Sequence, residues 1–420
     1  MVHGRAGLRP RRPHFAGRGC AGQPRLPRDR RLLRERPDMT RLTWGLIGGG
    51  RGSQIGPAHR LGARLDGLFD FAAAALDADP DAGRAYAAEL GVPSDRAYGT
   101  WQEMLEAEQA RPDPVDLVTV ATPNHTHYEI AHAFVSACIN VLCEKPMTMT
   151  VEEGESLVRA AREQGVLVGV NYGYSGYPLV RQMRDMVASG ALGAVRLVKA
   201  EFAHGHHADA ADADNPRVRW RYDPAQAGVS AVMADCGIHA LHMACFVTGQ
   251  QPERLSADFL STIPSRALED DALINVRLSG GATCRLWTSA IALGRQHGLT
   301  LQVFGETGGL SWAQEQPNQL FWTPVGGRTE IIERGSGGLS DAATAGSRVT
   351  VGHAEGMPLA FANLYADLAA DIRVLRAGGT PVSLCPDAED GLRSVAAVHA
   401  AAQSASQGGA WTDARPPLLR

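Results

Sequence analysis

Short runs of continuous apolar residues alternate with helix-like stretches through the first half of the chain. The apolar runs are WGLIG (44–48), FAAAAL (71–76), LVTVAT (117–122), NVLCE (140–144) and VLVGVN (166–171). Strands without polar alternation are buried on both faces, which requires helices on both sides of a parallel sheet. The pattern therefore predicts an α/β fold in which residues 41–171 form a doubly wound parallel sheet of the Rossmann type. We expect the covering helices after the first strand and over 80–90, 128–137 and 151–164.

The pattern changes after about residue 175. A helix over 179–189 precedes a strand over 195–203, and a loop rich in His and Asp leads to a helix that starts near Ala234. The strands expected next are 255–260, 271–278, 283–290, 299–304 and 309–314, and the closing helices are 359–376 and 387–406. Alternating strands separated by Gly pairs are typical of an antiparallel sheet. We therefore expect an α+β domain with an open, mainly antiparallel sheet over 172–407, and a tail over 408–420.

Charge is distributed unevenly along the chain. Residues 1–38 hold 11 Arg against three acids, a formal charge of +8, whereas the remainder has 30 cationic and 42 acidic residues, or −12. We expect a disordered basic leader, or a translation start at Met39, because such a composition cannot bury a core; a basic arm for nucleic acid is the alternative. The acidic remainder offers no basic face for DNA or anionic lipid. No run of 18 apolar residues predicts a membrane span.

Seven scattered cysteines without a CxxC pair argue against a disulfide framework or a zinc ribbon. They indicate a reducing compartment, and we expect a cytoplasmic location. The segment FAHGHHADAADAD (202–214) has metal-binding residue types, but its spacing matches no compact site. We therefore expect a polar loop there and no metal.

The segment GLIGGGRGSQIG (45–56) follows the first expected strand and precedes a helix. Gly48 and Gly50 occupy the first two places of the dinucleotide fingerprint, where glycine permits a tight turn and close approach of the pyrophosphate. Ser53 occupies the third place, and Arg51 lies in the same turn, so we expect both to contact the cofactor. Gly-rich turns are common, and an ordinary strand–helix connection is the alternative.

The second expected strand ends at Asp77, 27 residues after Gly50. An acid at this position can accept hydrogen bonds from ribose hydroxyls and repels a 2′-phosphate. It therefore favours NAD over NADP. The alternative is a helix-capping acid before Pro80.

Lys145 ends the strand-like segment VLCEKPM (141–147) in a chain with only two Lys among 41 cationic residues. Ligands of open α/β sheets bind at the carboxyl ends of the strands, so ATPNH (121–125) and CEKPM should face the same crevice as the glycine turn. A compact ammonium there can donate to a hydroxyl oxygen, which a permanently charged, forked guanidinium does less well. Chance survival, as for Lys199, is the alternative.

Together, GLIGGG, Asp77, VATPNHTH, VLCEKPM and ADCGIH (234–239) resemble the Gfo/Idh/MocA oxidoreductases over about residues 41–405. The resemblance implies an NAD-binding Rossmann domain and an open-sheet domain that binds substrate and mediates oligomers. It implies that Lys145 meets a substrate hydroxyl beside the nicotinamide and that Glu144 contacts the cofactor ribose. The other cofactor contacts that we expect are Thr122, Pro123, Asn124, His125 and His127.

The family's D-x-G-x-H motif reads Asp235-Cys236-Gly237-Ile238-His239. At helical spacing, residues i and i+4 share a face, so Asp235 and His239 can reach one substrate. A His with an ordinary pKa near 6.5 can take the alcohol proton, while Asp235 holds the substrate and favours the imidazolium. A capping acid beside a packed His is the alternative.

Residues in NYGYSGYP (171–178) and WRYDP (220–224) are the further substrate contacts that the resemblance implies. They are Asn171, Tyr172, Tyr174, Trp220 and Arg221; domain-joining surface is the alternative. The family's run of glycines before the Asp is replaced here by Gly228-Val229-Ser230-Ala231, which can reshape the substrate pocket.

Three functions agree with these residues. The first is an NAD-dependent dehydrogenase that oxidises a secondary hydroxyl of a sugar, inositol or glycoside. The second is a glycoside-cleaving relative that uses NAD transiently, and the third is a non-catalytic ligand sensor. We expect a homodimer or homotetramer formed through the second sheet.

Overall fold

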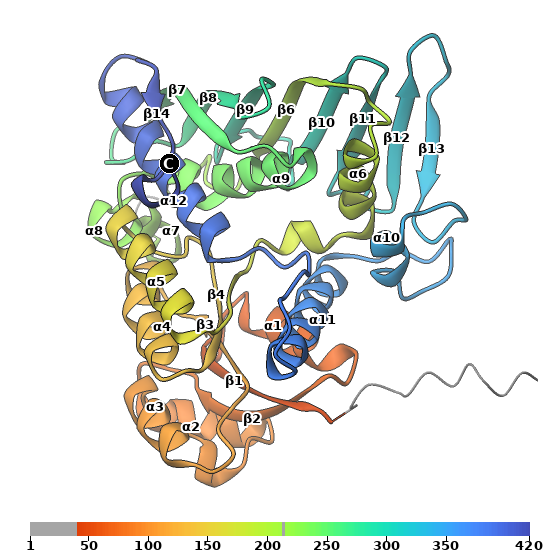
Figure 1. Cartoon of the computed structure of the whole chain (residues 1–420). Helices are drawn as coiled ribbons and strands as arrows, with labels where there is room; N and C mark the ends of the chain where they lie inside the picture. Colours follow the sequence, from red (N-terminus) through yellow and green to blue (C-terminus); the bar gives the residue numbers. More distant parts are fainter. Residues whose placement is uncertain (1–39, 212–214) are drawn as a thin grey trace, which may run out of the picture. The chain divides into compact units, whose positions relative to one another are not determined.

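The computed structural model describes residues 40–211 and 215–420, without the side chains of residues 216 and 217. The first sheet contains β1 (Leu42–Gly48), β2 (Phe69–Ala75), β3 (Leu117–Ala121), β4 (Asn140–Cys143) and β5 (Val168–Val170). All four strand pairs are parallel, in the order β2-β1-β3-β4-β5 (Figure 1). Next to β2, one isolated parallel bridge joins Ala74 to Ala97. The predicted doubly wound sheet is confirmed.

Helices connect the strands of the first sheet. They are α1 (Gly56–Leu65), α2 (Pro80–Glu89), α3 (Trp101–Ala110), α4 (His127–Ser136) and α5 (Val151–Gln164). The sequence pattern did not predict α3, because its 10 residues bury only Met104 and Glu108 and show no apolar stripe. Its start is nevertheless well determined, since the Thr100 side chain accepts a hydrogen bond from the Glu103 N–H.

The second sheet has nine strands in the order β13-β12-β11-β10-β6-β9-β8-β7-β14. They are β6 (Val195–Ala203), β7 (Pro252–Leu260), β8 (Asp271–Leu278), β9 (Thr283–Ser289), β10 (Leu299–Gly305), β11 (Gly308–Ala313), β12 (Gln319–Pro324), β13 (Glu330–Glu333) and β14 (Thr412–Asp413). Only β6 and β9 pair in parallel, so the prediction of an open, mainly antiparallel sheet is confirmed. Three strands were not predicted: β12, β13 and β14, of which β14 lies in the segment that we expected to be a tail.

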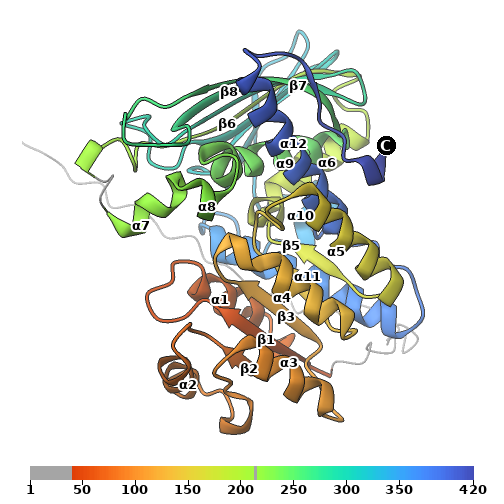
Figure 2. The ribbon, with the colours of Figure 1, turned by 90° about the vertical axis from the view of Figure 1, so that its left-hand side faces the viewer.

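The second sheet is covered on one face. Along β8, Ala272, Ile274 and Val276 are buried, whereas Leu273 between them is 54% exposed. Helices α6 (Pro178–Ala188), α9 (Ile238–Thr248) and α12 (Ala388–Ser406) belong to the core on the buried side (Figures 1 and 2). The short helices α7 (Pro216–Arg219), α8 (Pro224–Ala227) and α10 (Asp341–Ala345) lie in connecting segments. None of the helices that the structure describes is long and apolar enough to cross a membrane.

Helix α11 (Met357–Arg376) packs on the first sheet although it follows that sheet by almost 200 residues in the chain. Its Tyr365, Leu368 and Ile372 share a core with Trp44 and other side chains of β1, and α11 lies beside α1 (Figure 1). The boundary at residue 171 stays a prediction, but this helix, which we placed with the second domain, contributes to the first.

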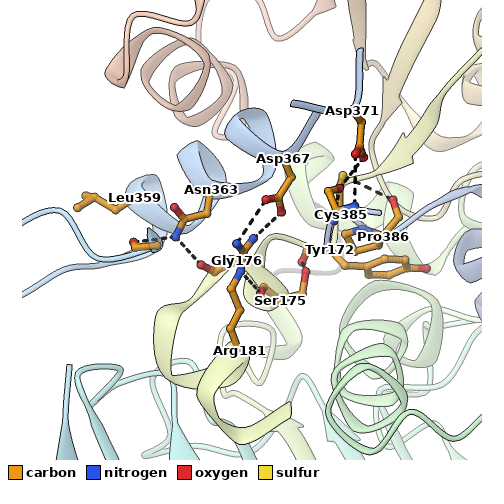
Figure 3. A network of polar contacts seen from close by, with 12 residues as sticks. Tyr172, Ser175, Gly176, Arg181, Leu359, Asn363, Asp367, Asp371, Cys385 and Pro386 are labelled. Atoms are coloured by element: carbon orange, nitrogen blue, oxygen red, sulfur yellow. Dashed lines mark hydrogen bonds and ion pairs between the residues drawn. The ribbon is translucent and has the colours of Figure 1, made fainter. Parts of the chain in front are cut away.

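Polar contacts join α11 to the segment that leads into α6 (Figure 3). Arg181 pairs with Asp367 at 2.7 Å, and Asn363 donates to the Gly176 carbonyl at 2.7 Å. The Arg181 side chain is only 5% exposed. Burial raises the pKa of Asp367, against the opposing effect of the Arg181 charge. The pair is therefore largely desolvated, and removing one member leaves a buried charge without its partner.

We expect Arg181→Leu to lower the free energy of unfolding by about 3–5 kcal/mol, because Asp367 then stays buried without its counter-ion. Urea denaturation of the full chain measures this effect. Arg41→Leu is the matched control: it breaks the exposed Arg41–Asp70 pair and should change little. Equal losses in the two variants would contradict the prediction.

Candidate active site

In the turn after β1, the backbone lies very close to neighbouring backbone segments. Gly48 has a φ of +74°, and a Cβ atom there would lie 2.5 Å from the Ala121 carbonyl oxygen. In α1, a Cβ atom on Gly56 would lie 2.1 Å from the Gly49 carbonyl oxygen. Close packing of helix on turn therefore depends on Gly56, which the fingerprint spacing did not identify. Ser53, at the expected third place, accepts a hydrogen bond from the Gly56 N–H at 3.1 Å. The amino end of a helix next to such a turn can bind an anion through its N–H groups.

A cleft of about 960 Å³ opens over this turn, at the carboxyl ends of the first-sheet strands. The predicted residues that line it are Gly48, Ser53, Asp77, Thr122, Pro123, Asn124, His125, Trp220 and Arg221. Gln54, Trp101, Gln102 and Gln226 also line it and were not predicted, because α3 was missed and neutral amides carry no motif signal. The cleft has the place and the glycine cradle that a dinucleotide needs.

Asp77 lies exposed at the end of β2 and faces this cleft. The cap of α2 is Asp79, whose side chain accepts from the N–H groups of Asp81 and Ala82. Asp77 therefore does not cap α2; it accepts a single hydrogen bond, from the Asp79 N–H at 3.1 Å. Its carboxylate keeps acceptor capacity for ribose hydroxyls.

Gly50 and Arg51 do not line the cleft. A Cβ atom on Gly50 would lie 2.4 Å from the Leu76 carbonyl oxygen, so this glycine packs the turn onto the end of β2. Arg51 pairs with Glu89 at 2.5 Å and lies over the Tyr86 ring. Contact between Arg51 and a cofactor stays a prediction.

Lys145 meets Asp235 where the two sheets' connecting loops approach each other. Its Nζ atom donates to Asp235 Oδ1 at 2.5 Å and to the Asp235 carbonyl at 2.7 Å. Arg221 Nε donates to Asp235 Oδ2 at 3.3 Å, and the Arg221 guanidinium lies over the Trp220 ring. Burial alone would raise the pKa of Asp235, but the charges of Lys145 and Arg221 hold it far below its usual range. The carboxylate is therefore ionised and shared between two cations.

Asp235 and His239 do not follow regular α-helical spacing. Residues Met233–Gly237 form a π-helical turn, and α9 begins only at Ile238. Wide turns of this kind are common at functional sites. The two side chains still interact, since the Asp235 carboxylate acts to raise the pKa of His239.

His239 is a neutral base in this site. Burial, followed by the charge of Lys145, lowers its pKa well below 6.5, and the opposing effect of Asp235 does not offset them. The ordinary pKa that we expected is therefore wrong. The His239 ring stands edge-on to Tyr174 at 4.8 Å. Its buried Nδ1 has no hydrogen-bond partner among the residues that the structure describes.

Four predicted contact residues lie in the interior instead of the cleft. His127 is fully buried between the carbonyl oxygens of Pro146 and Thr122, at 2.7 and 2.9 Å. Tyr172 is 1% exposed and stacks on His242, so it belongs to the core. Glu144 and Asn171 are buried and hydrogen-bonded to each other. Direct contact of these four residues with a ligand stays a prediction.

His297, in the loop between β9 and β10, was not predicted. Its Nε2 lies 2.9 Å from the Tyr174 hydroxyl, and its ring stacks on Phe202 at 4.6 Å. Because Tyr174 also contacts His239, His297 belongs to the same cluster of rings. No motif surrounds this His in the sequence, so no signal could have identified it.

The His-rich segment 202–214 lies partly outside the described residues. Within them, His204 Nε2 lies 3.4 Å from Cys236 Sγ, and burial lowers the pKa of His204 to about 4. No group of three or more His, Cys, Asp or Glu in the described part of the chain is arranged to hold a metal ion.

Comparisons with known proteins agree with this geometry. Residues 42–172 match the model of an oxidoreductase family with an NAD-binding Rossmann fold, and residues 180–311 match the GFO/IDH/MocA C-terminal domain. Uncharacterized oxidoreductase YfiI of Bacillus subtilis is 34% identical over 379 residues, covering 89% of this chain and 96% of the relative. The crystal structure of an inositol dehydrogenase homolog from Azotobacter vinelandii with NAD⁺ has a TM-score of 0.85 at 38% identity, over 89% and 97% of the two chains. Levoglucosan dehydrogenase of Pseudarthrobacter phenanthrenivorans is 26% identical over 67% of this chain and 76% of the relative.

We expect Asp77→Ala to weaken the binding of NAD about tenfold or more, because hydrogen bonds to a charged group contribute ~1.5–3 kcal/mol. Relative use of NADP should rise, since the repulsion of a 2′-phosphate disappears. Cofactor titrations by calorimetry measure both affinities. Asp79→Ala, which removes only the α2 cap, is the matched control and should leave the NAD to NADP ratio unchanged. An unchanged ratio in Asp77→Ala would refute the assignment.

Proposed function

Because the chain belongs to the GFO/IDH/MocA oxidoreductase family, with its NAD-binding Rossmann fold, we propose that it oxidises a secondary hydroxyl group of a sugar, an inositol or a glycoside. Reduction of the matching ketone is the same reaction in reverse. The observation that carries the proposal is the cluster of Lys145, Asp235 and His239, which is joined to the cofactor cleft through Arg221, a residue that lines the cleft and donates to Asp235. The family and the NAD cofactor that the sequence predicted are confirmed; the substrate is the proposed part.

The chain's own residues fit the cofactor. The turn at Gly48 and the amino end of α1 would hold the pyrophosphate, and Asp77 would accept from the adenosine ribose. Asn124 and His125 would line the nicotinamide end, as the family resemblance implies, and Thr122 and Pro123 line the same cleft. NAD, when bound, accepts a hydride from the carbinol carbon of the substrate.

Lys145 would stabilise the substrate oxygen. An ammonium group has three hydrogen-bond donors, and two of them are used by the carboxylate and the carbonyl of Asp235. The third can donate to the substrate hydroxyl, whose oxygen becomes more negative as it loses its proton to His239, and this charge is then used to form the carbonyl as the hydride leaves the carbon. A charge fixed in place before the reaction lowers the cost of that change.

His239 would take the hydroxyl proton. Its low pKa keeps the imidazole neutral, and a neutral ring nitrogen can accept. The imidazolium that forms lies beside the ionised Asp235, which stabilises it by charge. Asp235 thus orients Lys145 before proton transfer and stabilises His239 after it.

The substrate would lie against Tyr174, His297, Trp220 and Arg221, where aromatic faces and hydrogen-bonding groups suit a polyol ring. Structures related to this chain support that class: one solved homolog, at 38% identity, is complexed with NADH and myo-inositol. Levoglucosan dehydrogenase, named for an anhydro sugar, is a more distant relative.

The proposal also includes oligomer formation through the second sheet and a cellular location. The face of the second sheet that carries Leu273 and Phe304 is partly exposed, with these side chains 54% and 40% accessible, and we expect a homodimer or homotetramer to cover it. Six described cysteines are free thiols, which suits a reducing, cytoplasmic location.

A screen of NAD reduction across inositols, monosaccharides and glycosides tests the function. We expect one class to give NADH, and Lys145→Ala to lower kcat/KM about 100-fold or more, because a fixed donor and its charge are lost. Lys199→Ala, which removes the other lysine of the chain, a half-exposed side chain on strand β6, is the matched control. Bond cleavage without net NADH would favour the glycoside-cleaving alternative. Unchanged ligand response in Lys145→Ala, without turnover in wild type, would favour the sensor.

The pH dependence of oxidation should reflect the lowered pKa of His239. The neutral imidazole is the active form, so kcat/KM falls on acidification, with a midpoint below pH 6.5. Asp235 opposes the lowering of this pKa, whereas Lys145 and the neighbouring His242 and His297 contribute to it. Ketone reduction needs the protonated form and should weaken as pH rises through the same midpoint. A limb at or above pH 6.5 that disappears in His239→Asn would contradict the lowered pKa of His239, and a limb that persists in this variant would contradict its role as the base.

A further inference from the structure

A continuous chain of buried side-chain hydrogen bonds runs from strand β1 to the end of β4. Trp44 Nε1 donates to Thr119 Oγ1, which lies 2.9 Å from the Tyr365 hydroxyl. That hydroxyl lies 2.9 Å from His59 Nδ1, and His59 Nε2 lies 2.9 Å from Glu144 Oε1. All five side chains are buried, and none of them lines the cofactor cleft. We call these five residues the buried relay.

The buried relay ends at the backbone of the lysine of the active site. Glu144 Oε2 accepts a hydrogen bond from the Lys145 N–H at 3.1 Å, and Oε1 also accepts from the Asn171 side chain. Both carboxylate oxygens are therefore held from within the protein. One of them holds the residue whose Nζ reaches Asp235.

The numbers of donors and acceptors in the buried relay determine which atom donates in each of its hydrogen bonds. An indole N–H only donates, an ionised carboxylate only accepts, and each hydroxyl has one hydrogen. Among the described residues Thr119 has no other side-chain hydrogen bond, so its hydrogen goes to Tyr365 and that of Tyr365 goes to His59 Nδ1. His59 is then the Nε2–H tautomer, which donates to Glu144. The opposite direction would leave the Thr119 hydrogen without an acceptor and would require a buried imidazolium.

We propose that the buried relay is a positioning device for catalysis: His59 and Tyr365 fix the Glu144 carboxylate, which fixes the Lys145 backbone so that its ammonium reaches the substrate. This inference rests on the proposed function of Lys145. A lysine side chain has four rotatable bonds, and Asp235 restrains only its far end. The near end must be held as well, because a displacement of about 1 Å at a reacting group can lower the rate about 100-fold.

Such buried chains also stabilise folds, so the test must separate position from stability. Tyr365→Phe removes one hydroxyl from the relay. Tyr98→Phe is the matched control, because Tyr98 is also a buried tyrosine whose hydroxyl donates to a buried carboxylate, Glu108, at 2.8 Å. That contact has no connection to Lys145. Both variants should lower the midpoint of urea unfolding.

For the polyol that the screen identifies, we expect Tyr365→Phe to lower kcat about tenfold or more with little change in KM. Tyr98→Phe should stay within about twofold of wild type. His59→Gln, which keeps a donor close to the position of Nε2, should retain more activity than His59→Leu. An unchanged kcat in Tyr365→Phe and His59→Leu, or an equal loss in Tyr98→Phe, would overturn the proposal.

Two measurements on the full chain without cofactor or substrate test whether the buried relay holds the Lys145 backbone. Neither measurement depends on turnover. Amide hydrogen exchange at Lys145 should be faster in Tyr365→Phe and unchanged in Tyr98→Phe. The ring ¹⁵N shifts of His59 should show the Nε2–H tautomer in wild type. Unchanged exchange in Tyr365→Phe, or the Nδ1–H tautomer, would refute the relay. If the wild-type protein oxidises no polyol, the proposed function fails. These two measurements still show whether the buried relay holds the Lys145 backbone.

Discussion

The ion pair between Lys145 and Asp235 is the contact on which the site depends. Lys145 follows the parallel strand β4, and Asp235 lies in the turn that precedes α9, under the second sheet. Neither sheet alone carries the chemistry: the first supplies the cleft and the ammonium, and the second supplies the carboxylate and the imidazole. The pair holds these groups together, because its cost in desolvation is offset by two hydrogen bonds from one ammonium to one residue.

The order of charges around Asp235 explains why the site uses a lysine. Arg221 already holds one carboxylate oxygen, and Lys145 holds the other. A second guanidinium would spread its five donors in a plane, whereas an ammonium keeps a hydrogen for the substrate after binding Asp235. The same cation lowers the pKa of His239, so one charge both stabilises the substrate oxygen as it loses its proton and keeps the base neutral. The other lysine, Lys199, is half exposed and pairs with Glu201 on strand β6.

Most of the fold could be predicted from the sequence, because its strands are either continuously apolar or strictly alternating. Strands β6 and β8 have the predicted bounds, while α3 was missed because its buried face is nearly absent. The cleft-lining residues Gly48 and Asp77 could be picked out in the sequence, because a motif fixes the backbone geometry there. The sequence did not predict features that depend on where a side chain points. Tyr172 packs inward on His242, and His297 reaches Tyr174 from a loop without a motif. The π-helical turn at Asp235 was also missed, because a spacing of four residues reads the same in either helix.

The position of α11 shows why chain order is a poor guide to what supports a site. Tyr365 lies 220 residues after Lys145, yet it fills the gap between α1 and β3 and bonds to a side chain of each. A sheet that is buried on both faces leaves polar side chains such as Thr119 and His59 without water. A hydroxyl from outside the sheet must then satisfy them, since an unpaired buried polar group costs ~1–3 kcal/mol. The first sheet therefore depends on a helix of the carboxyl-terminal part for its polar interior, and the same hydroxyl is joined through His59 and Glu144 to the reactive lysine.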